Sequence, residues 1–266
     1  MASPGTVKPT LLAFHGSGSS ATIHTVQLAR LGRLLKPHLD IESLEAPFPS
    51  AAGPGILPFF EGCGPYKRWI PQTSSTLTVT PQTASSVTTS QSSSMPPEVE
   101  SLVRDTISTV RAKGGYVAGL IGFSQGTRVV AGLLKGAEIA RKLKEAGADG
   151  VEELDWLTFT FALSVCGSYP PPLIPPSVAA ALAASSIPEE EQKALVGAKI
   201  AIPTYHVQGN ADEWAWAGKL LIENSYDVGE GRSVVMEAEM GHHYPSKTEE
   251  SEKLRDWVLE VHWKAI

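Results

Sequence analysis

The sequence has few cysteines and no excess of positive charge, and each absence excludes a class of protein. Two cysteines, Cys63 and Cys166, are too few for a disulfide framework, and no Cys/His cluster has the spacing of a zinc site. Lysine and arginine number 22 against 28 aspartate and glutamate residues. The resulting net charge of -6 argues against nucleic acid as a partner, because phosphates attract basic surfaces.

Long apolar runs are also missing. No stretch approaches the ~18–20 apolar residues of a membrane span. The N-terminal residues lack the charged region and the apolar core of a signal peptide. We therefore expect a cytoplasmic protein with no membrane partner.

Short apolar runs, typical of strands, alternate with stretches that have helical spacing. The expected strands cover residues 8–14, 40–46, 116–123, 156–165, 199–207 and 232–238. The expected helices cover residues 22–35, 96–115, 125–145, 176–184, 188–196, 213–223 and 246–263. This alternation predicts an α/β fold with an open, mostly parallel sheet and helices on both faces. We expect residues 1–266 to form a single domain, because this length suits one sizeable core.

The connection between residues 47 and 95 shows neither pattern. Pro47, Pro49, Pro54 and Pro58 disfavour regular structure in its first part. Residues 72–95 contain 15 Ser or Thr in 24 positions and no charge, so they cannot bury enough surface to offset the entropy of ordering them. We predict a surface loop there. An edge hairpin is the alternative, because Thr and Val favour extended backbone.

The segment GLIGFSQGT (119–127) places Ser124 between two glycines, at the junction of an expected strand and an expected helix. In the pattern G-x-S-x-G, a sharp turn lifts the serine hydroxyl clear of the sheet, where it can act as a nucleophile. The glycines avoid clashes of a Cβ atom with neighbouring backbone. We expect the N–H of Gln125, at the start of the helix, to stabilise an oxyanion. The loop after the first strand is expected to supply the second donor, the N–H of Ser17.

A serine hydroxyl is a weak nucleophile near neutral pH, so it needs a base, and that base needs an acceptor to orient it. Four histidines follow Ser124, and two of them, His242 and His243, lie in the loop MGHHYP after the last expected strand. We choose His242 as the base because it directly follows Gly241. His243 is the alternative, with a role in the pocket wall or in helix capping as its other interpretation.

The acid is expected in the segment HVQGNADEW, in the loop after the strand 199–207. Asp212 is our choice. Glu213 competes with it, although its position fits the first turn of the next helix, where the helix dipole favours an acidic residue. Serine, acid and base then follow one another in the chain order that this type of site requires.

Five segments together resemble the fungal family of serine hydrolases within the α/β-hydrolases, a branch that includes the lovastatin-type polyketide thioesterases. They are LLAFHGSGSS (11–20), EGCGPYKRW (61–69), GLIGFSQGT (119–127), YHVQGNAD (205–212) and GHHYP (241–245). By matching positions, the resemblance implies an α/β-hydrolase fold with Ser124, Asp212 and His242 as the catalytic triad. The family passes from the Trp segment to the next helix by a shorter connection, so we interpret residues 72–95 as an insertion.

These residues lead us to expect hydrolysis of an acyl thioester or ester through an acyl-enzyme, with no cofactor and no metal. The resemblance implies release of a polyketide or other acyl chain in secondary metabolism, with the acyl-carrier domain of a polyketide synthase as partner. A general carboxylesterase or short-chain acyl thioesterase acting on free small molecules is the first alternative. A binding protein that keeps the fold without catalysis is the second.

Aromatic residues in the connections suggest an apolar acyl pocket, although a buried cluster explains them almost equally well. These residues are Phe59, Phe60, Tyr66, Trp69 and Tyr169. We interpret Trp214 and Trp216 as helix-packing residues. Lys67 and Arg68, beside the expected pocket, could attract an acidic carrier protein.

Overall fold

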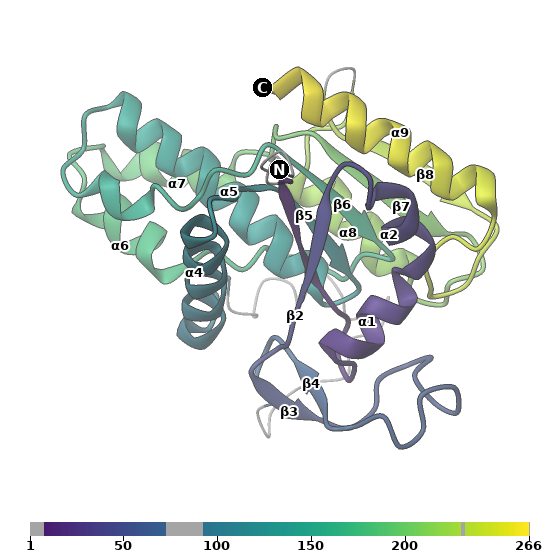
Figure 1. The fold of residues 1–266 in the computed structure, drawn as a ribbon. Helices are drawn as coiled ribbons and strands as arrows, with labels where there is room; N and C mark the ends of the chain where they lie inside the picture. The colour runs from purple at the N-terminus through teal and green to yellow at the C-terminus, as the bar shows by residue number, and fades with distance from the viewer. Residues whose placement is uncertain (1–7, 73–92, 230–231, 266) are drawn as a thin grey trace.

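The computed structural model describes residues 8–72, 93–229 and 232–265. Its main sheet has six parallel strands in the order β2-β1-β5-β6-β7-β8 (Figure 1). The strands are β1 (Thr10–Phe14), β2 (Asp40–Leu44), β5 (Val117–Phe123), β6 (Phe161–Val165), β7 (Thr204–Gly209) and β8 (Val234–Ala238). The predicted open, parallel sheet is confirmed.

Helices cover both faces of this sheet, as the alternating pattern predicts (Figure 1). In the described residues they are α1 (Ala21–Gln27), α2 (Ala29–Leu35), α4 (Pro97–Ala112), α5 (Gly126–Glu145), α6 (Pro176–Ala184), α7 (Glu189–Gly197), α8 (Ala215–Ser225) and α9 (Thr248–Ala265), with a 3-10 turn η1 (Val151–Leu154). Helices α2 and α9 pack together on one face, while α5 packs on β5 and α8 packs on β7. Within the described ranges, no helix has both the length and the apolar character to cross a bilayer.

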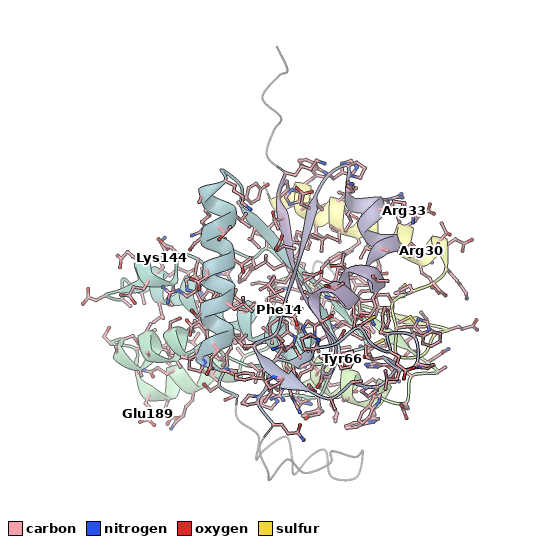
Figure 2. The ribbon with its side chains drawn as sticks, turned by 60° about the horizontal axis from the view of Figure 1, so that its bottom comes forward. Phe14, Arg30, Arg33, Tyr66, Lys144 and Glu189 are labelled. Atoms are coloured by element: carbon pink, nitrogen blue, oxygen red, sulfur yellow. The ribbon has the colours of Figure 1, made fainter. Side chains whose placement is uncertain are left out.

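Strand β1 illustrates how the two faces acquire their cores. Successive side chains of a strand point to opposite faces. Leu12 and Phe14 belong to the core that includes side chains of α4, α5 and α8, whereas Leu11 and Ala13 belong to the core that includes those of α2 and α9. Figure 2 accordingly shows Phe14 in the interior and the charged Arg30 of α2 at the periphery. Every residue of β1 and β5 is buried, as in a parallel sheet covered on both faces.

Two strands are shorter than the apolar runs that predicted them. The expected strand 156–165 begins only at Phe161, and the expected strand 199–207 begins only at Thr204. Pro203 precedes Thr204 and has no N–H to donate to a neighbouring strand. The residues before both strands still bury apolar side chains, and Ile200 forms only an isolated bridge with Tyr226, so the apolar pattern extends beyond the paired strands.

The expected helix 22–35 is two helices, α1 and α2, which meet at Leu28. The N–H of Leu28 still donates to the carbonyl of His24, at 2.8 Å. Since Leu28 and the apolar residues of α2 face the same core, their spacing continues across the break. The sequence pattern therefore does not reveal it.

A small second sheet corrects the expectation that prolines exclude regular structure after β2. Strand β3 (Phe48–Ser50) pairs antiparallel with β4 (Tyr66–Arg68), with Pro49 opposite Lys67. Proline is compatible with such an edge strand. In Figure 1 this sheet lies beyond the lower end of the main sheet, which is the end where its strands finish. The loop expected over 72–95 falls mostly on residues 73–92, outside the described part of the chain.

Candidate active site

The strand order places one crevice at the carboxyl ends of β1 and β5. From β1 the chain turns outward to β2, and from β5 it turns the other way to β6. Ligands of open parallel sheets bind at such switch points, because the two connections diverge there. A pocket of about 280 Å³ lies at this place. Its lining residues are Gly16, Ser17, Ser19, Pro54, Ile56, Arg68, Phe123, Ser124, Gln125, Gly167, Ser168, Tyr169, Trp214, Ala217 and His242.

Ser124 occupies the sharp turn between β5 and α5. Its φ of 48° lies in the left-handed region, which costs a non-glycine residue about 1–3 kcal/mol. The turn needs its two glycines: a Cβ atom on Gly122 would lie 2.8 Å from the Thr127 Cα, and one on Gly126 would overlap the carbonyl of Phe14. The Thr127 N–H and hydroxyl both donate to the carbonyl of Ser124, at 3.0 and 2.6 Å. The strained serine is therefore held by close packing on both sides.

The two expected oxyanion donors, on Ser17 and Gln125, lie on segments that line the pocket with Ser124. Within the described residues, neither backbone N–H donates to a protein acceptor. The Gln125 side chain accepts a hydrogen bond from the N–H of Trp69, at 2.8 Å. The Trp69 indole in turn donates to the carbonyl of His15, at 2.7 Å. Trp69 thus connects the loop after β1 to the turn after β5, which keeps both donors in place.

His242 and Asp212 meet at the same edge of the sheet. The His242 Nδ1 and the Asp212 Oδ2 are 2.8 Å apart, and the Asp212 side chain is almost completely buried. A second Asp212 oxygen accepts the N–H of Trp214, at 2.8 Å. With Nδ1 committed to the carboxylate, the Nε2 of His242 is the nitrogen that remains for the pocket. This is the arrangement of a base oriented by an acid.

Burial and hydrogen bonding act in opposite directions on Asp212. Burial raises the pKa of its carboxyl, but the hydrogen bonds from His242 and from the N–H of Trp214 outweigh it, and the pKa lies below its usual value. The carboxylate is therefore charged at neutral pH and stabilises a positive charge on the imidazole.

The competing residues lie elsewhere. The Nδ1 of His243 bonds to the carbonyl of Tyr244, at 2.8 Å, and its Nε2 accepts the N–H of Gly241, at 3.3 Å. Both ring nitrogens are engaged with their own loop. Glu213 is exposed and does not line the pocket.

A third side chain, which the sequence analysis did not connect with the site, lies behind this pair. Cys166 directly follows β6, and its sulfur contacts the carbonyl oxygens of Gly241 and His243, at 3.8 and 3.5 Å. Within the described residues, Cys166, Asp212 and His242 are the one group whose ligand-type atoms could surround a metal, all within 4.8 Å of one another. Burial, and then the charge of Asp212, raise the pKa of this thiol far above its usual value. Since metals bind the thiolate, these residues fit a hydrogen-bonded cluster better than a metal centre.

The expected aromatic wall is largely corrected by the structure. Tyr169 lines the pocket, beneath the buried guanidinium of Arg128 at 5.3 Å. Trp69 is completely buried behind the site, and Phe59 is 85% exposed. Phe60 and Tyr66 are joined by a hydrogen bond from the Tyr66 hydroxyl to the Phe60 carbonyl and do not line the pocket.

Other side chains form the wall instead. Ile56, Phe123 and Trp214 supply its apolar surface, and Arg68 supplies a charge. Trp214, which we interpreted as a packing residue, therefore belongs to the pocket. Its place two residues after Asp212 in the sequence is the signal that could have identified it.

Residues 4–254 match the family described as "Serine hydrolase (FSH1)". The chain belongs to this family and is an enzyme of the serine hydrolase class, as the resemblance in five segments predicted.

Two similar proteins of known name come from fungi. The chain is 31% identical over 257 residues to "Dihydromonacolin L-[lovastatin nonaketide synthase] thioesterase" of Aspergillus terreus, covering 92% of this chain and 90% of that protein. It is 28% identical over 255 residues to "Esterase FUS5" of Gibberella fujikuroi, covering 94% and 86%. Among solved structures, acyl-protein thioesterase 2 of Zea mays aligns with a TM-score of 0.48 and 18% identity, over 98% of this chain and 97% of that one.

Proposed function

We propose that Ser124, His242 and Asp212 act as a catalytic triad that hydrolyses acyl thioesters. The observation that carries this proposal is the bond of 2.8 Å between His242 and a buried, charged Asp212, with His242 and Ser124 on the wall of one pocket. The strained turn at Ser124 supports it, because strain at a non-glycine residue is characteristic of functional sites.

The reaction follows from these positions. The Nε2 of His242 accepts the proton of the Ser124 hydroxyl while the Ser124 oxygen attacks the acyl carbonyl. The N–H groups of Gln125 and Ser17 stabilise the negative oxygen, and each such donor contributes on the order of 3 kcal/mol. The leaving thiol takes the proton from His242, and an acyl-Ser124 ester remains. Water, activated by the same imidazole, releases the acid and restores the serine.

The acyl chain is proposed to come from a carrier protein. Support comes from the relative of Aspergillus terreus, whose name describes a thioesterase of a polyketide synthase. We also propose a cytoplasmic location, where the free thiols of Cys63 and Cys166 stay reduced, and one domain, since one sheet uses strands from Thr10 to Ala238. Hydrolysis of free esters is the second candidate, which the names of the esterase relatives favour.

A fluorophosphonate probe followed by mass spectrometry tests the triad. We expect one label, on Ser124, in the folded enzyme and none in Ser124→Ala. Labelling elsewhere, or no labelling of folded wild type, would contradict the assignment. Turnover of one acyl group on a carrier protein and as a p-nitrophenyl ester then separates the two candidates, because a carrier-dependent enzyme favours the first by a wide margin.

A further inference from the structure

Among the described residues that line the pocket, Arg68 is the one lysine or arginine, and none is an aspartate or a glutamate. The remaining wall is neutral or apolar, apart from the imidazole of His242. A positive charge therefore faces the place where the acyl chain must lie, although acyl hydrolysis itself does not require it.

The backbone on both sides of Arg68 is attached to the segments that carry the expected oxyanion donors. The Lys67 N–H donates to the carbonyl of Ser19 at 2.7 Å, and the Lys67 carbonyl accepts the N–H of Gly18 at 2.8 Å. On the other side, the Trp69 N–H donates to the Gln125 side chain at 2.8 Å. Because the chain is held on both sides of Arg68, the backbone of Arg68 has a defined position relative to the loop after β1 and the turn after β5. Its neighbour Lys67 does not line the pocket, as expected from the alternation of a strand.

The guanidinium has unused donors. Its Nη1 donates to the side chain of Gln72, at 3.3 Å, while its buried Nε has no hydrogen-bond partner among the described residues. No carboxylate of the described residues lies within 4.0 Å of it. The Arg68 side chain is half-buried, and this burial lowers the pKa of its guanidinium. A partly desolvated cation without a counter-charge is costly, and a planar guanidinium is the group best matched to a carboxylate.

We propose that Arg68 binds a carboxylate on the acyl chain, so that the enzyme prefers acyl groups that carry an acid a few bonds from the reacting carbonyl. This inference rests on the proposed thioester hydrolysis at Ser124. Arg68 and Ser124 line one pocket of about 280 Å³, and we place the carboxylate a few bonds from a carbonyl at Ser124. The phosphate of a phosphopantetheine arm is separated from its thioester by the whole pantetheine chain, and it does not fit this spacing.

Matched thioesters test the proposal. Glutaryl and pentanoyl groups have the same chain length, but only glutaryl carries a carboxylate, and N-acetylcysteamine as the thiol contains no phosphate. We expect the wild-type ratio of kcat/KM for glutaryl over pentanoyl to fall on the order of 10- to 100-fold in Arg68→Gln, the range for charged hydrogen bonds. Arg68→Lys should keep part of the preference. Lys67→Gln removes a neighbouring charge outside the pocket and should leave the ratio within about twofold of wild type.

Each other outcome overturns the inference in a distinct way. If the ratio of kcat/KM for glutaryl over pentanoyl is the same in wild type and Arg68→Gln, Arg68 does not bind a carboxylate of the acyl chain. If the same acyl groups on phosphopantetheine lose turnover in Arg68→Gln while the N-acetylcysteamine thioesters do not, the anion is the phosphate. In both cases pentanoyl turnover and fluorophosphonate labelling of Ser124 show that the proposed function survives. If wild type neither hydrolyses the pentanoyl thioester nor is labelled at Ser124, the proposed function is rejected, and this inference is rejected with it.

Discussion

The turns that follow β5 and β6 use the same unusual backbone and put it to different uses. Among the described residues, Ser124 and Cys166 are the two non-glycine residues with positive φ, at 48° and 47°. Each is anchored to the next strand in the same way: the Ser124 N–H donates to the carbonyl of Val165, and the Cys166 N–H to that of Val207. The hydroxyl of Ser124 lines the pocket, whereas the thiol of Cys166 is 1% exposed.

The difference shows that a strained turn is not by itself a catalytic group. At Ser124 the turn presents a side chain to the substrate pocket. At Cys166 it places a sulfur against the loop of His242 and beside Asp212, where it fills space behind the acid and the base. One turn exposes the proposed nucleophile, and the other supports the residues proposed to activate it.

The largest expected effect breaks this comparison at the first turn. Ser124→Ala should lower kcat/KM for a pentanoyl thioester by roughly 10⁴-fold or more, because no other group can form the acyl-enzyme. Cys166→Ala should lower it by less than about tenfold, since the thiol touches no substrate. Both variants should unfold cooperatively. A Cys166→Ala enzyme as inactive as Ser124→Ala would contradict the division of roles.

Acid should lower the free energy of unfolding, because buried histidines pack behind both turns. His15 lies behind the first, with Nδ1 on the Gly16 carbonyl at 2.7 Å, and His206 lies on the strand next to the second. Burial lowers the pKa of His15 to about 4 and that of His206 to about 3. In the unfolded chain both bind a proton near pH 6.5, so the stability they contribute is present above pH 6.5 and is lost as the pH falls below it.

Urea unfolding between pH 7.5 and pH 4.5 measures this loss. Each buried histidine should lower the free energy of unfolding by up to about 1.4 kcal/mol per pH unit below 6.5. His206→Phe keeps an aromatic ring against Tyr226 but cannot bind a proton. The change of its free energy of unfolding with pH should therefore be smaller than that of wild type, by up to about 1.4 kcal/mol per pH unit. A slope equal to that of wild type would show that His206 is protonated in the folded enzyme.

The glycines of the two turns provide the next test. A Cβ atom on Gly126 would overlap the backbone carbonyl of Phe14, which cannot move without displacing β1. A Cβ atom on Gly167 would lie 3.1 Å from the Cα of Gly218, on the helix α8, a milder contact. Gly126→Ala should therefore cost about 3 kcal/mol of stability and Gly167→Ala about 1 kcal/mol, as judged by denaturant midpoints. Equal losses of stability in the two variants would mean that the first turn is less tightly packed than the approach of Gly126 to the Phe14 carbonyl indicates.

These particulars show which features of a sequence can be interpreted without a structure. Ser124 could be identified because its glycines, the strand before it and the helix after it are local features. His242 could be chosen because one loop follows the last strand. The left-handed Cys166 has no such signal, since glycine is the residue that usually marks this conformation.

The pocket wall was harder to predict for a related reason. The alternation of side chains along β4 predicts that Arg68 and the following Trp69 face opposite sides. It does not predict which of the two sides faces the pocket. That depends on the pairing of β4 with β3 and on its contacts with the loop after β1, which join residues far apart in the sequence. Trp69 consequently enters the core and Arg68 the pocket, the reverse of what aromatic character suggested.

The smallest expected effect comes from the left-handed backbone strain at Ser124 and Cys166 alone. At Ser124, which borders the open pocket, Gly should be more stable than Ala by about 1 kcal/mol, because it relieves the left-handed strain and leaves no sealed void. At Cys166 the same relief is offset by a larger cavity, so Cys166→Gly should be no more stable than Cys166→Ala. Thermal unfolding of the four variants measures both differences. If Gly is favoured equally at both turns, the Cβ atom of Cys166 fills no space on which stability depends.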